Sequence, residues 1–101
     1  MVIYIDIDET ICSHSNSDPS KARDYLKAKP ITENIEKANK LYENNTIVYW
    51  TARGASTGID WTEVTKKQLD EWDCKYNDLK LGKPHYDLFI DDKAMNVKDW
   101  K

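Results

Sequence analysis

The sequence lacks the features of exported proteins, of membrane-spanning proteins and of proteins stabilised by disulfides or structural zinc. It contains 101 residues with only two cysteines, three glycines and three prolines. No apolar run approaches the roughly 18 residues of a membrane-spanning helix, and no stretch resembles a signal peptide. We therefore expect a cytoplasmic protein with reduced thiols and no membrane partner. Two cysteines do not make a four-ligand zinc site, and His14 and His85 are too few and too scattered along the chain to complete one.

A basic stretch is missing as well. The net charge is −3, the pI is near 5.3, and no basic run is longer than Lys66-Lys67. Nonspecific nucleic-acid binding requires a basic face, so a nucleic-acid partner is disfavoured. Apolar bulk, in contrast, is present: hydrophobic residues make up 40 % of the chain, with four Trp and six Tyr. This composition predicts one small globular domain over residues 1–101.

Short apolar runs predict β-strands at residues 2–5, 46–50 and 88–90, and each run ends at a polar residue. Continuous apolar runs of this kind are typical of strands buried on both faces. A weaker pattern indicates a further short strand within residues 76–81.

Apolar residues at helical spacing predict three helices between and after these strands. The first runs from Thr32, as its N-cap, to about residue 44. The second begins at an approximate capping box of Asp60 and Glu63 and ends near residue 72. A last short helix is expected from residue 93 to about 100.

The alternation of strands and helices predicts an α/β domain with a small parallel sheet and helices on both faces, a three-layer Rossmann-like fold. The irregular stretch from residue 12 to 30 is expected to form a loop beside the edge where open α/β sheets bind ligands.

Polar residues follow each predicted strand. Asp6 and Asp8 follow the first, Thr51 the second, and Asp91 and Asp92 the third. The carboxyl ends of parallel strands meet at one edge, so these side chains should gather there. Clustered carboxylates repel one another unless a cation neutralises them, and their hard oxygen atoms suit Mg²⁺.

Lys83 precedes the third predicted strand and can reach the same edge. A lysine and the Thr51 hydroxyl beside Mg²⁺ would form a receptor for a phosphoryl group. Each element alone has a plainer interpretation, as an acidic loop, a helix N-cap or a turn. Their order along the chain, and their placement after the predicted strands, favour phosphoryl transfer assisted by Mg²⁺.

Four segments of the chain resemble the four motifs of the haloacid dehalogenase-like (HAD) hydrolase superfamily. They are Asp6-Ile7-Asp8-Glu9-Thr10, Thr51, Lys83, and Ile90-Asp91-Asp92. The resemblance orders the chain from residue 2 to about 96 and implies a HAD-type fold. One departure is Glu9, where the commonest version of the motif has glycine. The spacing between the motifs leaves no room for a cap domain, so a small capless member is expected.

The resemblance also implies residue roles. Asp6 would be the nucleophile, Asp8 the general acid and base, and Thr51 and Lys83 the residues that hold phosphoryl oxygens. Mg²⁺ would be bound by Asp6, the main-chain carbonyl of Asp8, and the motif-four acids Asp91 and Asp92. Further candidates for substrate binding are Thr10, Arg53 and Asn96.

The expected activity is therefore Mg²⁺-dependent phosphomonoester hydrolysis through an aspartyl phosphate. A small phosphorylated metabolite, such as a sugar phosphate, is the expected substrate. An alternative is a nucleic-acid 3′-phosphatase, which would need a basic track. Another is a receiver-like signalling domain, although its adjacent acidic pair comes first in the chain and here the pair comes last.

The aromatic content exceeds what so small a core can hide, which indicates exposed aromatic surface. We therefore expect a possible homo-oligomer in which a neighbour's surface, or its 12–30 loop, covers the open site. The plainer interpretation is a monomer with Trp61 and Trp72 packed inward.

Overall fold

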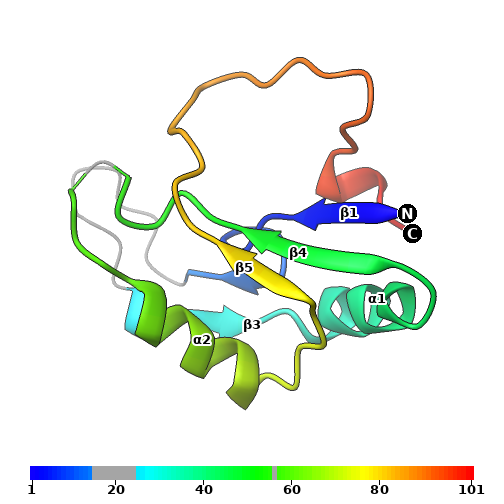
Figure 1. Ribbon diagram of the computed structural model, residues 1–101, viewed down its shortest axis with the longest axis horizontal. Coiled ribbons are helices and arrows are strands. Elements are labelled where there is room, and N and C mark those ends of the chain that lie inside the picture. The colour runs from blue at the N-terminus through cyan, green and yellow to red at the C-terminus, as the bar shows by residue number, and fades with distance from the viewer. Residues whose placement is uncertain (15–24, 56) are drawn as a thin grey trace.

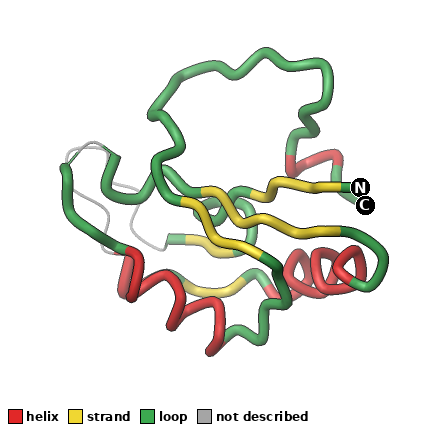
Figure 2. The backbone as a smooth tube through the Cα atoms, viewed as in Figure 1, coloured by secondary structure: helices red, strands yellow, loops and turns green. Residues whose placement is uncertain are grey.

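A three-stranded parallel sheet packed against two α-helices forms the centre of the protein (Figures 1 and 2). The computed structural model describes residues 1–14, 25–55 and 57–101. The strand order in the sheet is β1-β4-β5. The elements are β1 (Val2–Ile5), β2 (Cys12–Ser13), η1 (Tyr25–Lys27), β3 (Lys29–Pro30), α1 (Thr32–Tyr42), β4 (Thr46–Trp50), α2 (Thr62–Glu71), β5 (Asp78–Lys80) and η2 (Val97–Asp99).

One face of the sheet carries the core. The register pairs Ile3 with Ile47 and Ile5 with Tyr49, so these side chains share a face. They pack in one cluster with residues of α1 and α2, including Leu69. The chain crosses from β1 to β4 to β5 in one direction, and right-handed crossovers in one direction place both helices on the same face (Figure 1).

The α/β class and the small parallel sheet are therefore confirmed. We expected α-helices on both faces of the sheet, but in the described part of the chain both α-helices lie on one face. The opposite face is exposed over β1, where Val2 and Tyr4 are 62 % and 47 % exposed, whereas Val48 of β4 on the same face is buried. The Tyr4 ring meets the Trp50 ring edge to face at 5.7 Å, and Lys80 Nζ lies 3.1 Å from Tyr4 Oη. The expectation of burial on both faces holds for the centre of β4, where Ile47, Val48 and Tyr49 are all buried, and was wrong for the outer strand β1, whose Val2 and Tyr4 side chains have little covering them.

The third strand of the sheet is β5, which lies within the weaker predicted stretch. Asn77 starts its pairing with β4: the Asn77 N–H donates to the Ile47 carbonyl, and Asn77 Oδ1 accepts from the Ile47 N–H, both at 2.8 Å. The strand predicted at 88–90 is absent from the described structure. Leu88 and Ile90 are instead 75 % and 87 % exposed, because a run of three apolar residues forms a strand only where a neighbouring strand pairs with it.

Residues 81–96, which we call the arm, connect β5 to η2 as a wide arc (orange in Figure 1, a single green loop in Figure 2). The helix expected over 93–100 is reduced to the single turn of η2, which Asn96 caps by accepting from the Lys98 N–H at 2.9 Å.

The helix starts lie close to the expected positions. Ile31 occupies the N-cap position of α1 without a side-chain cap, so Thr32 is the first helical residue rather than the cap. Asp60 Oδ1 accepts from the Thr62 N–H at 2.9 Å at the start of α2. In the stretch expected as a loop, β2 pairs with β3, and residues 15–24 lie outside the described residues. No helix in the described ranges is long and apolar enough to cross a membrane.

The packing predicts a sharp contrast between two isoleucines. Ile47 is fully buried in the core and Ile59 is 55 % exposed. We expect Ile47→Ala to lower the free energy of unfolding by about 2–5 kcal/mol, because it removes transfer energy and leaves a cavity. Ile59→Ala should stay within about 0.5 kcal/mol of the wild type. Urea unfolding measures both, and equal losses would contradict the assigned core.

Candidate functional site

The candidate site lies at the carboxyl end of the sheet, where hydrogen bonds join the exits of β4 and β5. The Thr51 N–H donates to the Lys80 carbonyl at 3.0 Å, and the Lys83 N–H donates to the Thr51 carbonyl at 3.1 Å. Gly82 lies between them at φ 88°, in the left-handed region that glycine adopts without strain. This turn brings Lys83 Nζ to 3.7 Å from Asp6 Oδ1.

An open pocket of about 270 Å³ forms around this ion pair. Three of the predicted catalytic residues line it, together with residues from the first loop and the start of the arm. The lining consists of Asp6, Asp8, Glu9, Ala52, Lys83, Pro84, His85 and Tyr86. The site is thus a shallow, open depression.

Thr51 precedes Ala52 of the pocket lining and is itself fully buried. Its Oγ1 accepts a hydrogen bond from the Arg53 N–H at 3.1 Å, which fixes the turn that follows β4. The Thr51 hydroxyl is therefore buried and already hydrogen-bonded in this structure, so it is not exposed to a phosphoryl oxygen in the pocket.

Asp6 is the more accessible of the two first-motif acids, with its side chain 37 % exposed. Burial raises its pKa above the ordinary value, and the nearby Lys83 charge opposes that rise only in part. Asp6 therefore has one cationic neighbour, Lys83, and a side chain that is partly exposed to the pocket. Such a carboxylate is accessible to a ligand that enters the pocket.

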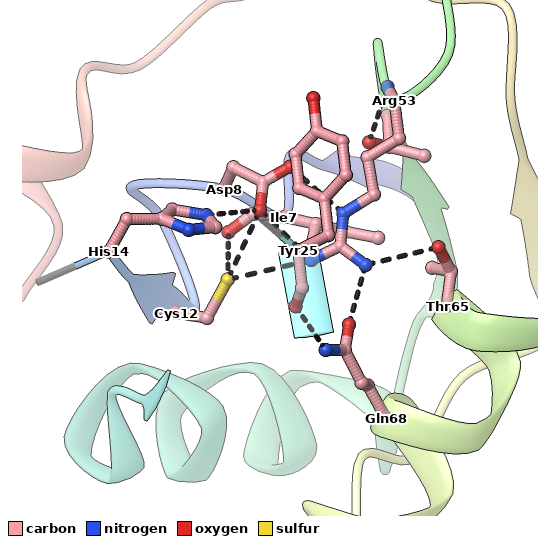
Figure 3. Close-up of polar contacts among 9 residues, drawn as sticks. Ile7, Asp8, Cys12, His14, Tyr25, Arg53, Thr65 and Gln68 are labelled. Carbon is pink, nitrogen blue, oxygen red and sulfur yellow. Dashed lines mark hydrogen bonds and ion pairs between the residues drawn. The ribbon is translucent and has the colours of Figure 1, made fainter. Parts of the chain in front are cut away.

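Asp8 is held by Arg53 in a two-pronged ion pair (Figure 3). Arg53 Nε donates to Asp8 Oδ2 at 3.0 Å and Nη2 donates to Oδ1 at 2.9 Å. Burial pushes the pKa of Asp8 upward, but the hydrogen bonds and charge of Arg53, together with His14, outweigh it and leave the pKa below the ordinary value. Asp8 is therefore fixed in place as a carboxylate.

Arg53 is itself fully engaged. It is only 2 % exposed, its Nη1 donates to Thr65 Oγ1 and Gln68 Oε1 on α2, and its guanidinium lies 4.7 Å from the Tyr25 ring centre. The expectation that Arg53 contacts the substrate is thus corrected. A buried guanidinium whose donors are used within the protein acts through Asp8.

His14 and Cys12 also reach Asp8, which the sequence interpretation missed. His14 Nε2 lies 2.8 Å from Asp8 Oδ1, and the Cys12 thiol donates to the same oxygen at 3.4 Å. The signal was the i, i+2 spacing of Cys12 and His14, which puts both on one side of an extended segment. What the spacing does not reveal is the pairing of β2 with β3 that folds this segment back.

Asp8, Cys12 and His14 place their ligand atoms within 4.8 Å of one another. A metal ion here would have to compete with Arg53, whose Nη2 already contacts Asp8 Oδ1. Burial raises the pKa of the Cys12 thiol to about 12. Arg53 is therefore the cation of this cluster.

The remaining candidates do not line the pocket. The Thr10 carbonyl accepts from Asn34 Nδ2 at 2.8 Å, which ties the first loop to α1, and Asn96 caps η2. Asp91 and Asp92 are exposed on the arm, and Asp91 Oδ1 accepts from the neighbouring Lys93 N–H at 2.7 Å. No contact in the described structure joins these two acids to Asp6.

Glu9 follows Asp8 in a tight turn and has φ 62°. Side chains are disfavoured in this left-handed region, and glycine is not. The position at which this chain departs from the HAD motif is thus one where the backbone itself favours glycine.

Comparisons with known proteins support the fold. No protein-family profile and no curated protein matches this chain. A crystal structure of a structural-genomics target from Vibrio cholerae is similar, with a TM-score of 0.78 and 22 % sequence identity. The similarity covers 98 % of this chain and 85 % of that one. At this identity the likeness shows a shared small Rossmann-like α/β fold.

The Asp8–Arg53 pair predicts a large stability effect. In Arg53→Ala the buried Asp8 carboxylate loses its cation, and we expect the free energy of unfolding at pH 7 to fall by about 3–5 kcal/mol. Arg53→Lys should recover only part of this, because an ammonium cannot form the two-pronged contact. Lys66→Ala, an exposed change on α2, is the matched control in urea unfolding. A loss no greater than that of the control would contradict the assigned pair.

The same pair predicts acid sensitivity. The pKa of Asp8 is lowered on folding, so its contribution to stability is complete above its unfolded pKa of about 3.9 and is lost as the pH falls through the lower folded pKa. The raised pKa of Asp6 acts in the opposite direction. We expect unfolding below about pH 4 to be less steep in Asp8→Asn than in the wild type. Identical slopes in an acid titration followed by circular dichroism would refute this assignment.

Proposed function

We propose that the protein is a phosphomonoester hydrolase in which Asp6 accepts the phosphoryl group and Lys83 holds its oxygens. The observation that carries this proposal is the placement of Asp6 and Lys83 in one open pocket, with their charged atoms 3.7 Å apart. Asp8 lines the same pocket and is fixed from behind by Arg53. A nucleophile, a cation and an oriented acid–base group are the parts that covalent phosphoryl transfer needs.

The proposed reaction has two steps. In the first, an Asp6 oxygen forms a bond to phosphorus as the bond to the leaving oxygen breaks, and protonated Asp8 gives its proton to that oxygen. In the second, water gives a proton to Asp8 and attacks phosphorus, and the bond between Asp6 and phosphorus breaks. Arg53 favours the ionised form of Asp8, which the second step requires, so the first step is the more demanding of the two.

Mg²⁺ is part of the proposal because the resembled superfamily uses it. Asp6 lines the pocket with a carboxylate, and the resemblance implies the main-chain carbonyl of Asp8 as a second hard oxygen donor; Mg²⁺ binds proteins through few such groups, together with water and substrate phosphate. When bound, Mg²⁺ would offset the charge on the transferring group. Asp91 and Asp92, the other predicted ligands, are carried by the arm.

The open pocket supports a small phosphorylated metabolite, such as a sugar phosphate, as the substrate. One observation favours a second candidate, a nucleic-acid 3′-phosphate. Lysines alternate with aromatic rings beside the pocket: Lys83 Nζ lies 5.7 Å from the Trp50 ring centre and 5.4 Å from that of Tyr86, and Lys80 Nζ lies 5.6 Å from that of Tyr4. Such surfaces stack bases and attract backbone phosphates.

A screen of phosphate release tests the proposal and separates the two substrates. It would offer sugar phosphates, nucleotides and 3′-phosphorylated oligonucleotides, each with Mg²⁺ and with chelator. We expect Mg²⁺-dependent release from at least one class, and strongest release from sugar phosphates. Release that is undiminished after exhaustive chelation would contradict the role of the metal.

Asp6→Asn provides the matched prediction. Turnover should fall by on the order of a thousandfold or more, because an amide cannot form the phosphoryl intermediate. The melting temperature in chelator should not fall, because the change removes a carboxylate whose pKa is raised by burial. Asp70→Asn, an exposed change on α2, should alter neither activity nor melting temperature. Near-native turnover of Asp6→Asn would rule out the covalent scheme.

A further inference from the structure

Glu9 lines the pocket, yet the proposed reaction gives it no part. Its backbone has φ 62°, a left-handed conformation in which a side chain is disfavoured and glycine is not. Several hydrogen bonds close the turn that imposes this conformation. The Glu9 N–H donates to the Cys12 carbonyl at 2.8 Å. The N–H groups of Thr10 and Ile11 donate to the Ile7 carbonyl at 3.1 and 2.9 Å. The left-handed conformation of Glu9 is therefore fixed by the turn.

Asp73 is the other described residue besides glycine with a positive φ, at 56°, and it offers a comparison. It follows α2, and its N–H donates to the Asp70 carbonyl at 3.2 Å, at a helix end where a left-handed residue is common. Short aspartate side chains tolerate this conformation better than longer ones. The helix end thus accounts for Asp73. No such reason applies to Glu9, and strained residues of this kind cluster at sites of binding and catalysis.

The charges around the pocket indicate what the Glu9 carboxylate can do. Two other carboxylates line the pocket, and each has a cation against it. Lys83 Nζ lies 3.7 Å from Asp6 Oδ1, and Arg53 Nη2 lies 2.9 Å from Asp8 Oδ1. A third carboxylate makes the potential in the pocket more negative, which opposes the binding of an anionic phosphoryl group. The charge of Glu9 therefore suits the rest of the substrate rather than the phosphoryl group.

A carboxylate discriminates between leaving groups by their charge. It accepts strong hydrogen bonds from hydroxyl groups, and it repels a second phosphate. Selectivity commonly combines an attractive element of this kind with a repulsive one. Tyr86 lines the same pocket, is 41 % exposed, and adds an aromatic ring and a hydroxyl group. Aromatic surface with a few polar groups is the usual lining of a site for a small ligand. An uncharged leaving group rich in hydroxyl groups fits this lining best.

We propose that Glu9 determines which leaving group the pocket accepts: its carboxylate accepts hydrogen bonds from the hydroxyl groups of an uncharged leaving group and repels one that carries a further phosphate. This role rests on the proposed function, because it assumes that the phosphoryl group binds at Asp6 and Lys83. It makes Glu9 a specificity-determining residue. It also explains why glutamate occupies a position where glycine would cost less free energy.

Binding of glucose 6-phosphate and of glucose 1,6-bisphosphate tests this role, because the two ligands differ by one phosphate. Titration calorimetry would use the full chain in the Asp6→Asn background with Mg²⁺, so that no turnover disturbs the measurement. We expect the bisphosphate to bind more weakly. Glu9→Gln keeps the length of the side chain and removes its charge, so it should shift the ratio of the two Kd values by about tenfold toward the bisphosphate. An unchanged ratio overturns the proposal, and so does the failure of both ligands to bind.

Glu9→Gly and Asp73→Gly separate this role from a structural one. Both place glycine at a left-handed position, so neither should lower the melting temperature. Only Glu9→Gly should shift the ratio of Kd values as Glu9→Gln does, and an equal shift in Asp73→Gly overturns the proposal. If the ratio shifts as expected but no substrate releases phosphate, the selection by charge stands and the proposed hydrolysis fails. Phosphate release that depends on Mg²⁺, with an unchanged ratio, overturns the selection and leaves the hydrolase standing.

Discussion

The ion pair between the partly buried Asp8 and the buried Arg53 is the interaction on which the rest of the site depends. It joins the exit of β1 to the exit of β4, and through Thr65 and Gln68 it joins both to α2. A buried charge is tolerated only when paired and hydrogen-bonded, so these elements cannot shift independently. The same ion pair gives Asp6 and Asp8, which lie two residues apart, different pKa values and different surroundings. Asp8 is held as a fixed anion with a lowered pKa, while Asp6, with a raised pKa, faces the open pocket.

Much of this arrangement could be predicted from the sequence because it depends on local pattern. The β-branched runs at 2–5 and 46–50 form strands, and helical spacing places α1 and α2 within a few residues of their observed positions. The rule that parallel strands end at one edge places Asp6 and Asp8 at one pocket, where Lys83 also lies, but its prediction for Asp91 and Asp92 fails because residues 88–90 form no strand in the described structure. The role of Arg53 could not be read in this way, because its burial depends on Thr65 and Gln68, which only the packing of α2 brings near.

The other differences between the predicted and the observed strands arise from strand pairing, which the local sequence pattern does not encode. Asp78–Lys80 becomes a strand because the preceding Asn77 bonds to Ile47, whereas the more apolar 88–90 run has no strand beside it in the described structure. Both helices cover one face because both crossovers run in one direction across the sheet, and over β1 the opposite face and the outer edge stay open. The arm, which carries Asp91 and Asp92, therefore has no strand partner in the described structure, and neither has the outer edge of β1.

We propose that Asp6 carries the phosphoryl group, and chemical identification of the phosphorylated residue tests this role most directly. An enzyme reacting with the best substrate from the screen would be quenched in acid during turnover and reduced with borohydride, which converts an aspartyl phosphate to homoserine. Peptide mass spectrometry would then locate the modified position. The account predicts homoserine at position 6 and unmodified aspartate at position 8. Phosphate release with an unmodified Asp6, or modification at another residue, would contradict it.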